Sequence, residues 1–430
     1  MAEANTQGPQ PQALPGPQEN VRPKFSGPIA RIDFLEGVRG VLASWVMIGH
    51  FLLFLGAATL LKTGGATLLG KAAFIAVNGE TPVYLFMIIS GFVICHLIRS
   101  RAEPYGVYIF RRYLRLFPSL ACCFVIGLLV SYWQPDVLTR LPWGDDSFLV
   151  VVTHNASLHR QYVTQNILAH IPLIHGLIPP SALPDAAAAF LGPAWSISTE
   201  WQFYLIAPLA VAASRRLFSL VFLCLGVVLL QVFFAHYRLA ASQGAFNPGF
   251  IGLYVQYFFI GGVSYFVWRA LHRAAAAAPW LGNVQGIVLC GAGISMFMLM
   301  PALQGIVSGG MSLTPFLSVS VFAIWIFLFS CLCQVTLAPH GIEARIVQAV
   351  GCCPPAMFLG RISYSVYMVH FPLAIVLLRF AKPFWQMPRP AFVVLFLIAG
   401  SLATIGAAAL LYRYVEAPSI RWAKNKFRER

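Results

Sequence analysis

Residues 82–98 read PVYLFMIISGFVICHLI, a run without a single charged side chain. A run of this length and apolarity approaches the ~20 residues that a helix needs to cross the hydrocarbon of a bilayer. Only helices and closed barrels satisfy the backbone polar groups there. The rest of the chain is similar: its 430 residues are 59% hydrophobic and only 10% charged, against about 25% charged in a typical soluble domain. The composition predicts an integral membrane protein and excludes an ordinary cytosolic enzyme, a disordered chain and a disulfide scaffold.

Ten segments are long and apolar enough to be candidate spans. They are 38–61, 82–98, 118–133, 195–213, 217–236, 250–268, 284–303, 315–335, 358–378 and 391–411. Runs this long do not alternate with the period of two that barrel strands require. The predicted fold is therefore an all-α bundle of about ten transmembrane helices, and an even number of spans places both termini on one side.

The basic residues indicate which side that is. If the N-terminus is cytoplasmic, 21 of the 29 Lys and Arg residues lie on the cytoplasmic side and the remaining 8 lie outside. Because cytoplasmic loops carry an excess of Lys and Arg, both termini are predicted to be cytoplasmic. The net charge of +15 then reflects topology, and it does not indicate a nucleic-acid partner.

The chain is expected to divide into a transmembrane domain and two short tails. Residues 1–30 are rich in Pro, Gln and Gly, which predicts a disordered cytoplasmic tail. Residues 31–420 would form the transmembrane domain, and 421–430 a basic cytoplasmic tail. The start of the chain has no signal-peptide pattern, so the first span is expected to direct insertion. The long connection 134–194 is predicted to lie outside and to contain interfacial or re-entrant helices, at 148–152 and 167–178.

The first span carries three ionisable side chains, Glu36, Arg39 and His50, on one stripe. Their spacing of three and eleven residues returns to nearly the same helix face at 100° per residue. His50 lies about 16 Å beyond Arg39 by helix rise, near the middle of the membrane. An ionisable residue at that depth is a candidate functional residue. The alternative is a histidine that is hydrogen-bonded inside the bundle for structural reasons.

Glu200, in the fourth span, is predicted to lie at a depth similar to that of His50. It is about 8 Å below the outer edge, and His50 is about 12 Å below the same edge. An imidazole and a carboxylate at one depth suit a general base and the group that orients it. The alternative is a polar belt that links two helices.

Three arginines, Arg111, Arg112 and Arg115, crowd one face in the connection between the second and third spans. The guanidinium fork matches phosphate oxygens, so the cluster is a candidate phosphate site. The alternative is plain anchoring of the cytoplasmic edge. In the preceding span, Gly91 of the Ser90-Gly91-Phe92 segment is expected to let another backbone or a thin ligand approach.

The ninth span contains Tyr364, Tyr367 and His370, which could line one surface that faces the bundle. A structural histidine before the proline at position 372 is the alternative there. The four histidines of the long loop, His154, His159, His170 and His175, come without a pattern of accompanying carboxylates. No metal site is predicted.

Taken together, these segments resemble the membrane-bound acyltransferase 3 family from residue 31 to residue 418. Five short motifs occur in the order found in that family. They are Arg31, Leu35, Glu36, Gly37, Arg39, Gly40 and His50; Ser90-Gly91-Phe92; Arg111, Arg112, Arg115 and Pro118; Trp195, Ser196, Ser198, Glu200, Phe203 and Tyr204; and Ile362, Ser363, Tyr364, Ser365, Tyr367, His370 and Pro372, followed by Glu416-Ala417-Pro418. The family more often has Asp where Glu36 stands, and often an acidic or bulky residue where Trp201 stands.

The resemblance implies transfer of an acyl group, often acetyl, from cytoplasmic acyl-CoA to a hydroxyl of a carbohydrate. Typical acceptors are surface polysaccharides, their lipid-linked precursors and other glycosides, and the bacterial inner membrane is the expected location. Acyl-CoA would act as co-substrate, with no tightly bound cofactor. The expected partners are this donor, the glycan or glycolipid acceptor and the lipid bilayer. No nucleic-acid partner is expected.

Specific roles follow for the motif residues. His50 would be the general base, with Glu200 stabilising its imidazolium form, and Ser198 or Tyr364 would stabilise the oxyanion. The CoA phosphates would bind Arg39, Arg111, Arg112 and Arg115. Arg31, Glu36, Ser90, Tyr204 and His370 would support these groups. Direct transfer and an acyl-histidine intermediate both fit.

A transporter or flippase that uses a buried His/Glu relay is the main alternative, because proton relays use the same residues. No inverted repeat or matched pair of broken helices is visible to support it.

Overall fold

The computed structural model describes residues 32–58, 77–101, 103–144, 146–214, 225–227, 229–230, 233, 248–277, 287–307 and 313–427. Residues Asp33–Arg430 form one unit, and within the described residues it is helical without any strand. The predicted tail 1–30 lies outside the described residues, as do the last three residues of the predicted tail 421–430.

The helices follow the predicted spans closely. In chain order the α-helices are α1 (Asp33–Phe54), α4 (Glu80–Ser100), α5 (Tyr105–Ser131), α6 (Gln134–Thr139), α7 (Ser147–Gln161), α8 (Val163–His170), α9 (Ala194–Ala213), α11 (Val255–Ala277), α12 (Ile287–Val307), α13 (Leu313–Leu337), α14 (Ile342–Gly351), α15 (Pro354–Phe380), α16 (Arg389–Leu411) and α17 (Ala417–Lys426). Shorter helical turns are η1 (Ala186–Ala188), η2 (Ile251–Leu253), η4 (Lys382–Phe384) and η5 (Tyr412–Glu416). Every predicted span except 217–236 overlaps one of these helices, and 217–236 lies largely outside the described residues.

Six helical segments of the described chain are long and apolar enough to cross a membrane. They are Asp33–Phe54, Glu80–Ser100, Tyr105–Ser131, Ser318–Leu337, Pro354–Phe380 and Arg389–Lys426. The prediction of an all-α integral membrane protein is therefore confirmed. The number of ten spans and the cytoplasmic placement of both termini stay predictions.

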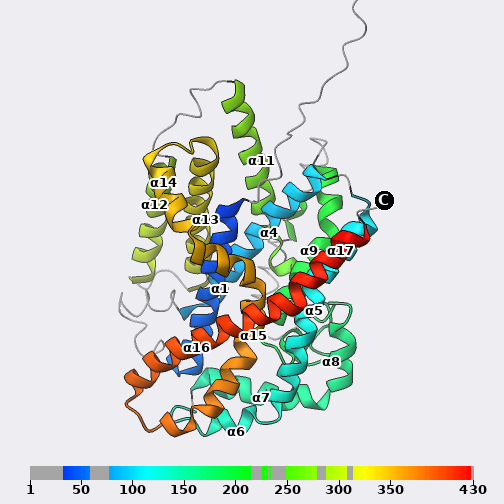
Figure 1. Cartoon of the computed structure of the whole chain (residues 1–430), viewed down its shortest axis with the longest axis vertical. Coiled ribbons are helices and arrows are strands. Elements are labelled where there is room, and N and C mark those ends of the chain that lie inside the picture. The colour runs from blue at the N-terminus through cyan, green and yellow to red at the C-terminus, as the bar shows by residue number, and fades with distance from the viewer. Residues whose placement is uncertain are drawn as a thin grey trace, which may run out of the picture. The chain divides into compact units, whose positions relative to one another are not determined.

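Helices α1 and α15 run side by side in the middle of the bundle (Figure 1). Glycines make this approach possible. A Cβ on Gly40 would lie 2.6 Å from the Gly360 nitrogen and 2.8 Å from the Leu359 Cβ. A Cβ on Gly360 would in turn overlap the Glu36 carbonyl oxygen. Small residues allow helix backbones in a membrane to pack closely, and this packing brings the ionisable stripe of α1 against α15.

Gly40→Val is accordingly expected to lower stability by about 1–3 kcal/mol, because the added side chain has no space between the helices. The measurement is the unfolding midpoint of the purified protein in detergent. Gly406→Val on α16 is the matched control, since a Cβ there meets no described atom within 4 Å. Equal midpoints for the two variants would contradict the close approach of α1 and α15.

Helix α4 packs along α11 in the same manner. A Cβ on Gly91 would overlap the carbonyl oxygen of Phe258, and a Cβ on Gly261 would overlap that of Ile88. The expectation that Gly91 lets another element approach is confirmed, and that element is the backbone of α11. Helix α9 then packs against α4 and α5.

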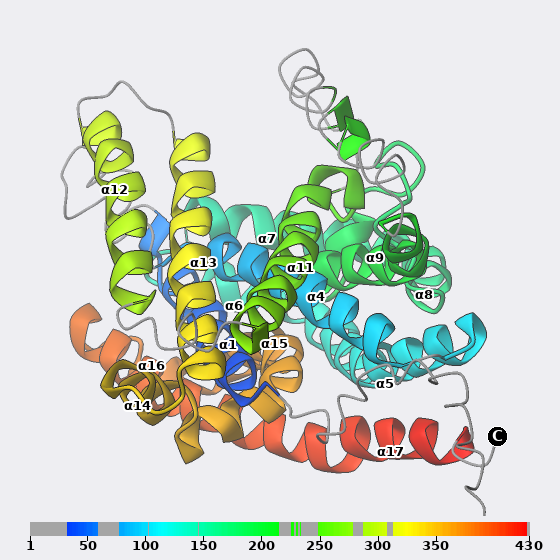
Figure 2. The same ribbon diagram turned by 90° about the horizontal axis from the view of Figure 1, so that it is seen from above.

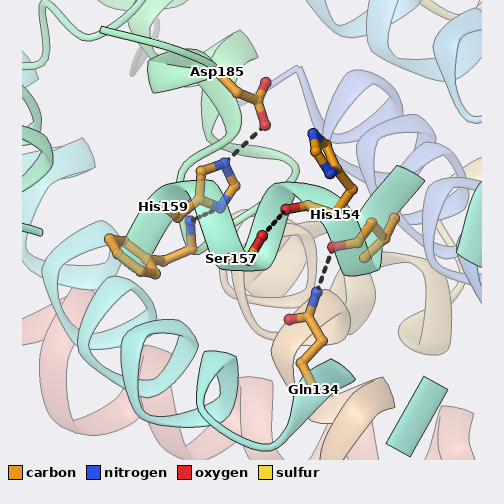
Figure 3. Close-up of polar contacts among 7 residues, drawn as sticks. Gln134, His154, Ser157, His159 and Asp185 are labelled. Atoms are coloured by element: carbon orange, nitrogen blue, oxygen red, sulfur yellow. Dashed lines mark hydrogen bonds and ion pairs between the residues drawn. The ribbon is translucent and has the colours of Figure 1, made fainter. Parts of the chain in front are cut away.

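Helices α6, α7 and α8 gather at one end of the bundle (Figure 1). The predicted segment 148–152 lies within α7, and 167–178 is helical only as far as His170, the end of α8. The placement of the connection 134–194 outside the membrane, and an interfacial or re-entrant character for these helices, stay predictions. Polar contacts tie this module together (Figure 3): Gln134 donates to the Val152 carbonyl oxygen, and Ser157 donates to that of His154. Trp143 Nε1 donates to the Phe54 carbonyl oxygen at the end of α1, so the module is attached to the first span.

Helices α16 and α17 form one continuous rod (Figure 2). They are joined by η5, which is a π-helical turn. A π-turn adds a residue to the helical repeat and is frequent at functional sites. Here it ends at Glu416, whose side chain is buried. Beyond it, α17 packs against α5, with the Trp422 ring 5.8 Å from that of Phe110.

Candidate active site

A small cavity opens between α1, α4, α9, α11 and α15. Its polar wall includes Arg39, Ser90, Glu200 and the aromatic hydroxyl residues Tyr364 and Tyr367. The apolar lining comprises Val83, Phe86, Met87, Ile197 and Phe258. Motif residues from four separate segments of the chain therefore meet around one space.

Glu200 is held by two hydroxyl groups. Ser90 Oγ donates to Glu200 Oε1 at 3.1 Å, and the Tyr204 hydroxyl, one turn along α9, donates to the same oxygen. No hydrogen bond joins Glu200 to His50 among the described residues. The structure therefore corrects the predicted pairing of these two residues. Helix rise predicts the depth of each side chain in the membrane, but it does not predict the direction in which the side chain points. Glu200 faces α4.

Three guanidinium groups lie near the hydrogen-bonded pair of Glu200 and Tyr204. Arg39 lines the cavity, and its Nε atom is buried without a hydrogen-bond partner. The Arg112 guanidinium lies 5.9 Å from the centre of the Tyr204 ring, and its Nε is likewise buried without a partner. Arg115 is close enough to Glu200 to interact with it electrostatically. No ion pair with a carboxylate forms at Arg39, Arg112 or Arg115 within the described part of the chain.

The arginine cluster was predicted to precede the third span, and this boundary is corrected. Helix α5 begins at Tyr105 and continues through Pro118, so the cluster is helical. The helix separates its members: Arg112 and Arg115 face Tyr204 and Glu200, whereas Arg111 forms an ion pair with Glu103 and lies 6.0 Å from the Phe427 ring centre. Arg111 is therefore already neutralised by a carboxylate.

His50 and His370 form a direct pair between α1 and α15. His50 Nδ1 lies 3.1 Å from His370 Nε2 and 3.1 Å from the Val46 carbonyl oxygen. His370 is fully buried, and its Nδ1 lies 3.1 Å from the Val366 carbonyl oxygen. The predicted stripe of α1 thus places His50 against the predicted surface of α15.

Tyr367 connects the cavity to the histidine pair. It lines the cavity, shares a 2.7 Å hydrogen bond with Ser196 Oγ, and its ring centre lies 6.0 Å from that of His370. On the other side of the pair, the Phe371 ring meets the His50 ring edge-on at 5.8 Å. A continuous set of side chains therefore runs from the arginines to the imidazoles.

Two predicted oxyanion donors have other roles. Ser198 Oγ donates its proton to the Leu173 carbonyl oxygen at 2.8 Å and accepts from Gly176 N, which anchors the loop before α9. The Tyr364 hydroxyl donates to the Leu116 carbonyl oxygen at 2.6 Å. Because each hydroxyl has a single proton, neither group fits oxyanion stabilisation in this geometry. Among the described residues that line the cavity, Arg39 has a buried guanidinium Nε without a hydrogen-bond partner.

The remaining predicted residues are Glu36 and Arg31, and the structure adds Glu416 to the site. Glu36 lies in the first turn of α1 against Gly360, and Arg31 lies outside the described residues. Glu416 was noted only as part of the last motif. It accepts a 2.7 Å hydrogen bond from Ser365 and interacts electrostatically with Arg39 and Arg115. The sequence feature that could have identified Glu416 is an acidic residue at the end of the last predicted span.

The loop histidines form contacts within the segment of residues 134–194. His159 Nε2 lies 2.8 Å from Asp185 Oδ2, and the Phe190 amide donates to His159 Nδ1 (Figure 3). The His170 and His175 rings stack with centres 3.9 Å apart. Burial lowers the pKa of His175 to about 4 and that of His170 well below its usual value. Both rings are therefore neutral packing groups at pH 7, and no group of three metal-binding side chains occurs in the described residues.

These features define an integral membrane protein with a buried, cation-rich site beside a histidine pair. The family model of an acyltransferase domain, that of acyltransferase 3, matches residues 32–413. The chain belongs to this family, and it is a membrane acyltransferase. Comparison with curated proteins gave no match, and comparison with solved structures gave none either.

Proposed function

We propose that this protein transfers an acyl group, typically acetyl, from cytoplasmic acyl-CoA to a hydroxyl of a carbohydrate acceptor. The acceptor would be a surface polysaccharide or its lipid-linked precursor, modified at the bacterial inner membrane. The observation that carries the proposal is the set of arginines without ion pairs beside a cavity whose lining residue Tyr367 lies next to His370, with ring centres 6.0 Å apart. Buried charges without close ion pairs are costly. Glu200 and Glu416 interact electrostatically with Arg39 and Arg115, but two carboxylates do not balance three guanidinium groups, and a polyanionic donor would supply further negative charge.

The two ends of the site suit the two ends of acyl-CoA. Phosphate oxygens would bind Arg112 and Arg115 through charge-assisted hydrogen bonds. The pantetheine arm is thin and about 15–20 Å long, which is comparable with the rise of α1 from Arg39 to His50. The apolar wall formed by Val83, Met87 and Phe258 would accommodate this arm.

The chemical step would take place at His50. The acceptor hydroxyl gives its proton to the imidazole as its oxygen forms a bond to the thioester carbonyl carbon. The C–S bond then breaks, and the imidazolium returns the proton to the CoA thiolate. An ester and CoA–SH leave the site, and His50 is regenerated. Arg39, whose donors face the cavity, would stabilise the negative charge that develops on the carbonyl oxygen.

Gly79 would be the point at which the acceptor reaches His50. A Cβ built on Gly79 would lie 3.4 Å from His50 Cε1. The backbone of Gly79 has φ −72° and ψ −13°, which any residue can adopt. A larger side chain at this position would therefore cover the imidazole without straining the backbone.

Gly79→Leu is expected to lower kcat/KM for the acceptor at least about tenfold, because a few added carbons at a reacting site cost ~1–3 kcal/mol. Binding of CoA should stay unchanged. Steady-state kinetics with varied acceptor, together with CoA titration, measures both. Gly79→Ala is the matched control, because its methyl group reaches only van der Waals contact. Full activity of Gly79→Leu would place acceptor entry elsewhere.

The proposed activity is tested with purified protein in lipid nanodiscs. The assay measures release of CoA thiol from acetyl-CoA in the presence of glycan, and mass spectrometry measures the added acyl mass on the glycan. Thiol release that depends on both substrates is expected. No release with any acyl-CoA, together with proton-coupled flux in vesicles, would instead support a transporter. Mass spectrometry of surface glycans from a deletion strain would identify the natural acceptor.

A further inference from the structure

The hydrogen bonds of His370 determine which of its nitrogens carries the proton. His370 Nδ1 faces the Val366 carbonyl oxygen, and a carbonyl oxygen can only accept. Nδ1 must therefore carry hydrogen, which leaves Nε2 of the neutral ring with a lone pair. His370 thus presents a hydrogen-bond acceptor to His50.

The same reasoning then determines the state of His50. Its Nδ1 faces two acceptors, His370 Nε2 and the Val46 carbonyl oxygen, at 3.1 Å each. A lone pair on His50 Nδ1 would face both of these lone pairs, so Nδ1 carries hydrogen and donates to them. The other nitrogen, His50 Nε2, has no hydrogen-bond partner among the described residues. It is left as the basic atom of the pair.

We infer that His370 is a positioning residue that selects the Nδ1–H tautomer of His50, so that His50 Nε2 is the atom that takes the proton of the acceptor hydroxyl. The inference rests on the proposed acyl transfer. In it, the neutral imidazole of His370 has the role that a carboxylate has in a Ser-His-Asp triad. Once His50 has taken the proton, its Nδ1–H still donates to His370 Nε2. The pair therefore keeps its geometry through the reaction.

The environment of His370 holds this arrangement. The side chain is fully buried. Tyr367 lies on one side of it, and Phe371 packs against its partner His50. The close approach of α1 and α15 through Gly40 and Gly360 fixes the distance between the two rings. A purely structural histidine would need no specific partner, whereas this one contacts the single imidazole of α1.

The test compares two substitutions at position 370. His370→Leu removes the acceptor, and kcat is expected to fall by about 100-fold or more, with KM for acetyl-CoA unchanged within about twofold. His370→Gln places a carbonyl oxygen close to the position of Nε2, and kcat should return to within about tenfold of wild type. Unchanged kcat in His370→Leu, or equal loss in both variants at wild-type melting temperatures, would overturn the inference.

A measurement on the unmodified protein keeps the inference testable if both variants unfold. In protein labelled with ¹⁵N-histidine, the nitrogen shifts of His50 report directly which atom is protonated, with His50→Gln used to assign the signal. Hydrogen on Nδ1 supports the inference, and hydrogen on Nε2 overturns it. Failure of the proposed function gives a different result, because wild-type protein would then release no thiol whatever the tautomer.

Discussion

His50→Ala is expected to reduce acyl transfer by a factor of about 10³–10⁴, because it removes the group that takes the acceptor proton. The fall should be in kcat, with little change in the affinity for CoA, since the phosphate-binding arginines stay in place. The measurement is the single-turnover rate with saturating acetyl-CoA and acceptor, alongside CoA titration of the same preparation.

Helix α11 offers a matched control for this substitution. His272 is also a partly buried helical histidine, and its Nδ1 lies 2.9 Å from the Trp268 carbonyl oxygen four residues earlier, as His50 Nδ1 does from Val46. Unlike His50, it has no imidazole partner among the described residues. His272→Ala should keep wild-type activity. Full transfer by His50→Ala would remove His50 from the chemistry and leave it as a structural residue of the bundle.

The parts of the site that sequence could predict are those set by one helix. The spacing of Glu36, Arg39 and His50 defines a face of α1, and that face does meet α15, because helical periodicity is local. Contacts between helices are different. Glu200 was expected beside His50 from depth alone, yet it turns to Ser90, and His370 takes the place beside His50. Helix rise gives a height, but the rotation of each helix depends on packing that only the folded chain reveals.

The arginine cluster illustrates the same limit. Sequence predicts that Arg111, Arg112 and Arg115 lie near one another, but it does not reveal that Glu103 pairs with one of them. Glu416 was missed as a site residue for a related reason: a π-turn rotates it toward the interior, and no periodic pattern anticipates such a turn. Helices were thus predictable from composition, whereas charge pairing between them was not.

Arg115→Gln and Arg112→Gln are expected to raise KM and Kd for acyl-CoA by about 10–100-fold each. Hydrogen bonds to charged groups contribute about 1.5–3 kcal/mol, and each ~1.4 kcal/mol is a factor of ten in affinity. Glutamine keeps much of the side-chain volume, so the loss should be in charge rather than packing. Equilibrium binding of CoA to purified protein at several salt concentrations measures the effect, and the loss should be largest at low salt.

Arg111→Gln is the matched control within the same helix. Its guanidinium is already paired with Glu103, so removing it should change CoA affinity by no more than about twofold. A general role in anchoring α5 at the membrane edge would make the three substitutions equivalent, because all three remove one positive charge from one short segment. A difference between Arg111 and its two neighbours therefore separates donor binding from anchoring. If instead all three variants bind CoA as wild type does, the cluster serves only to orient the helix, and the donor phosphates bind elsewhere.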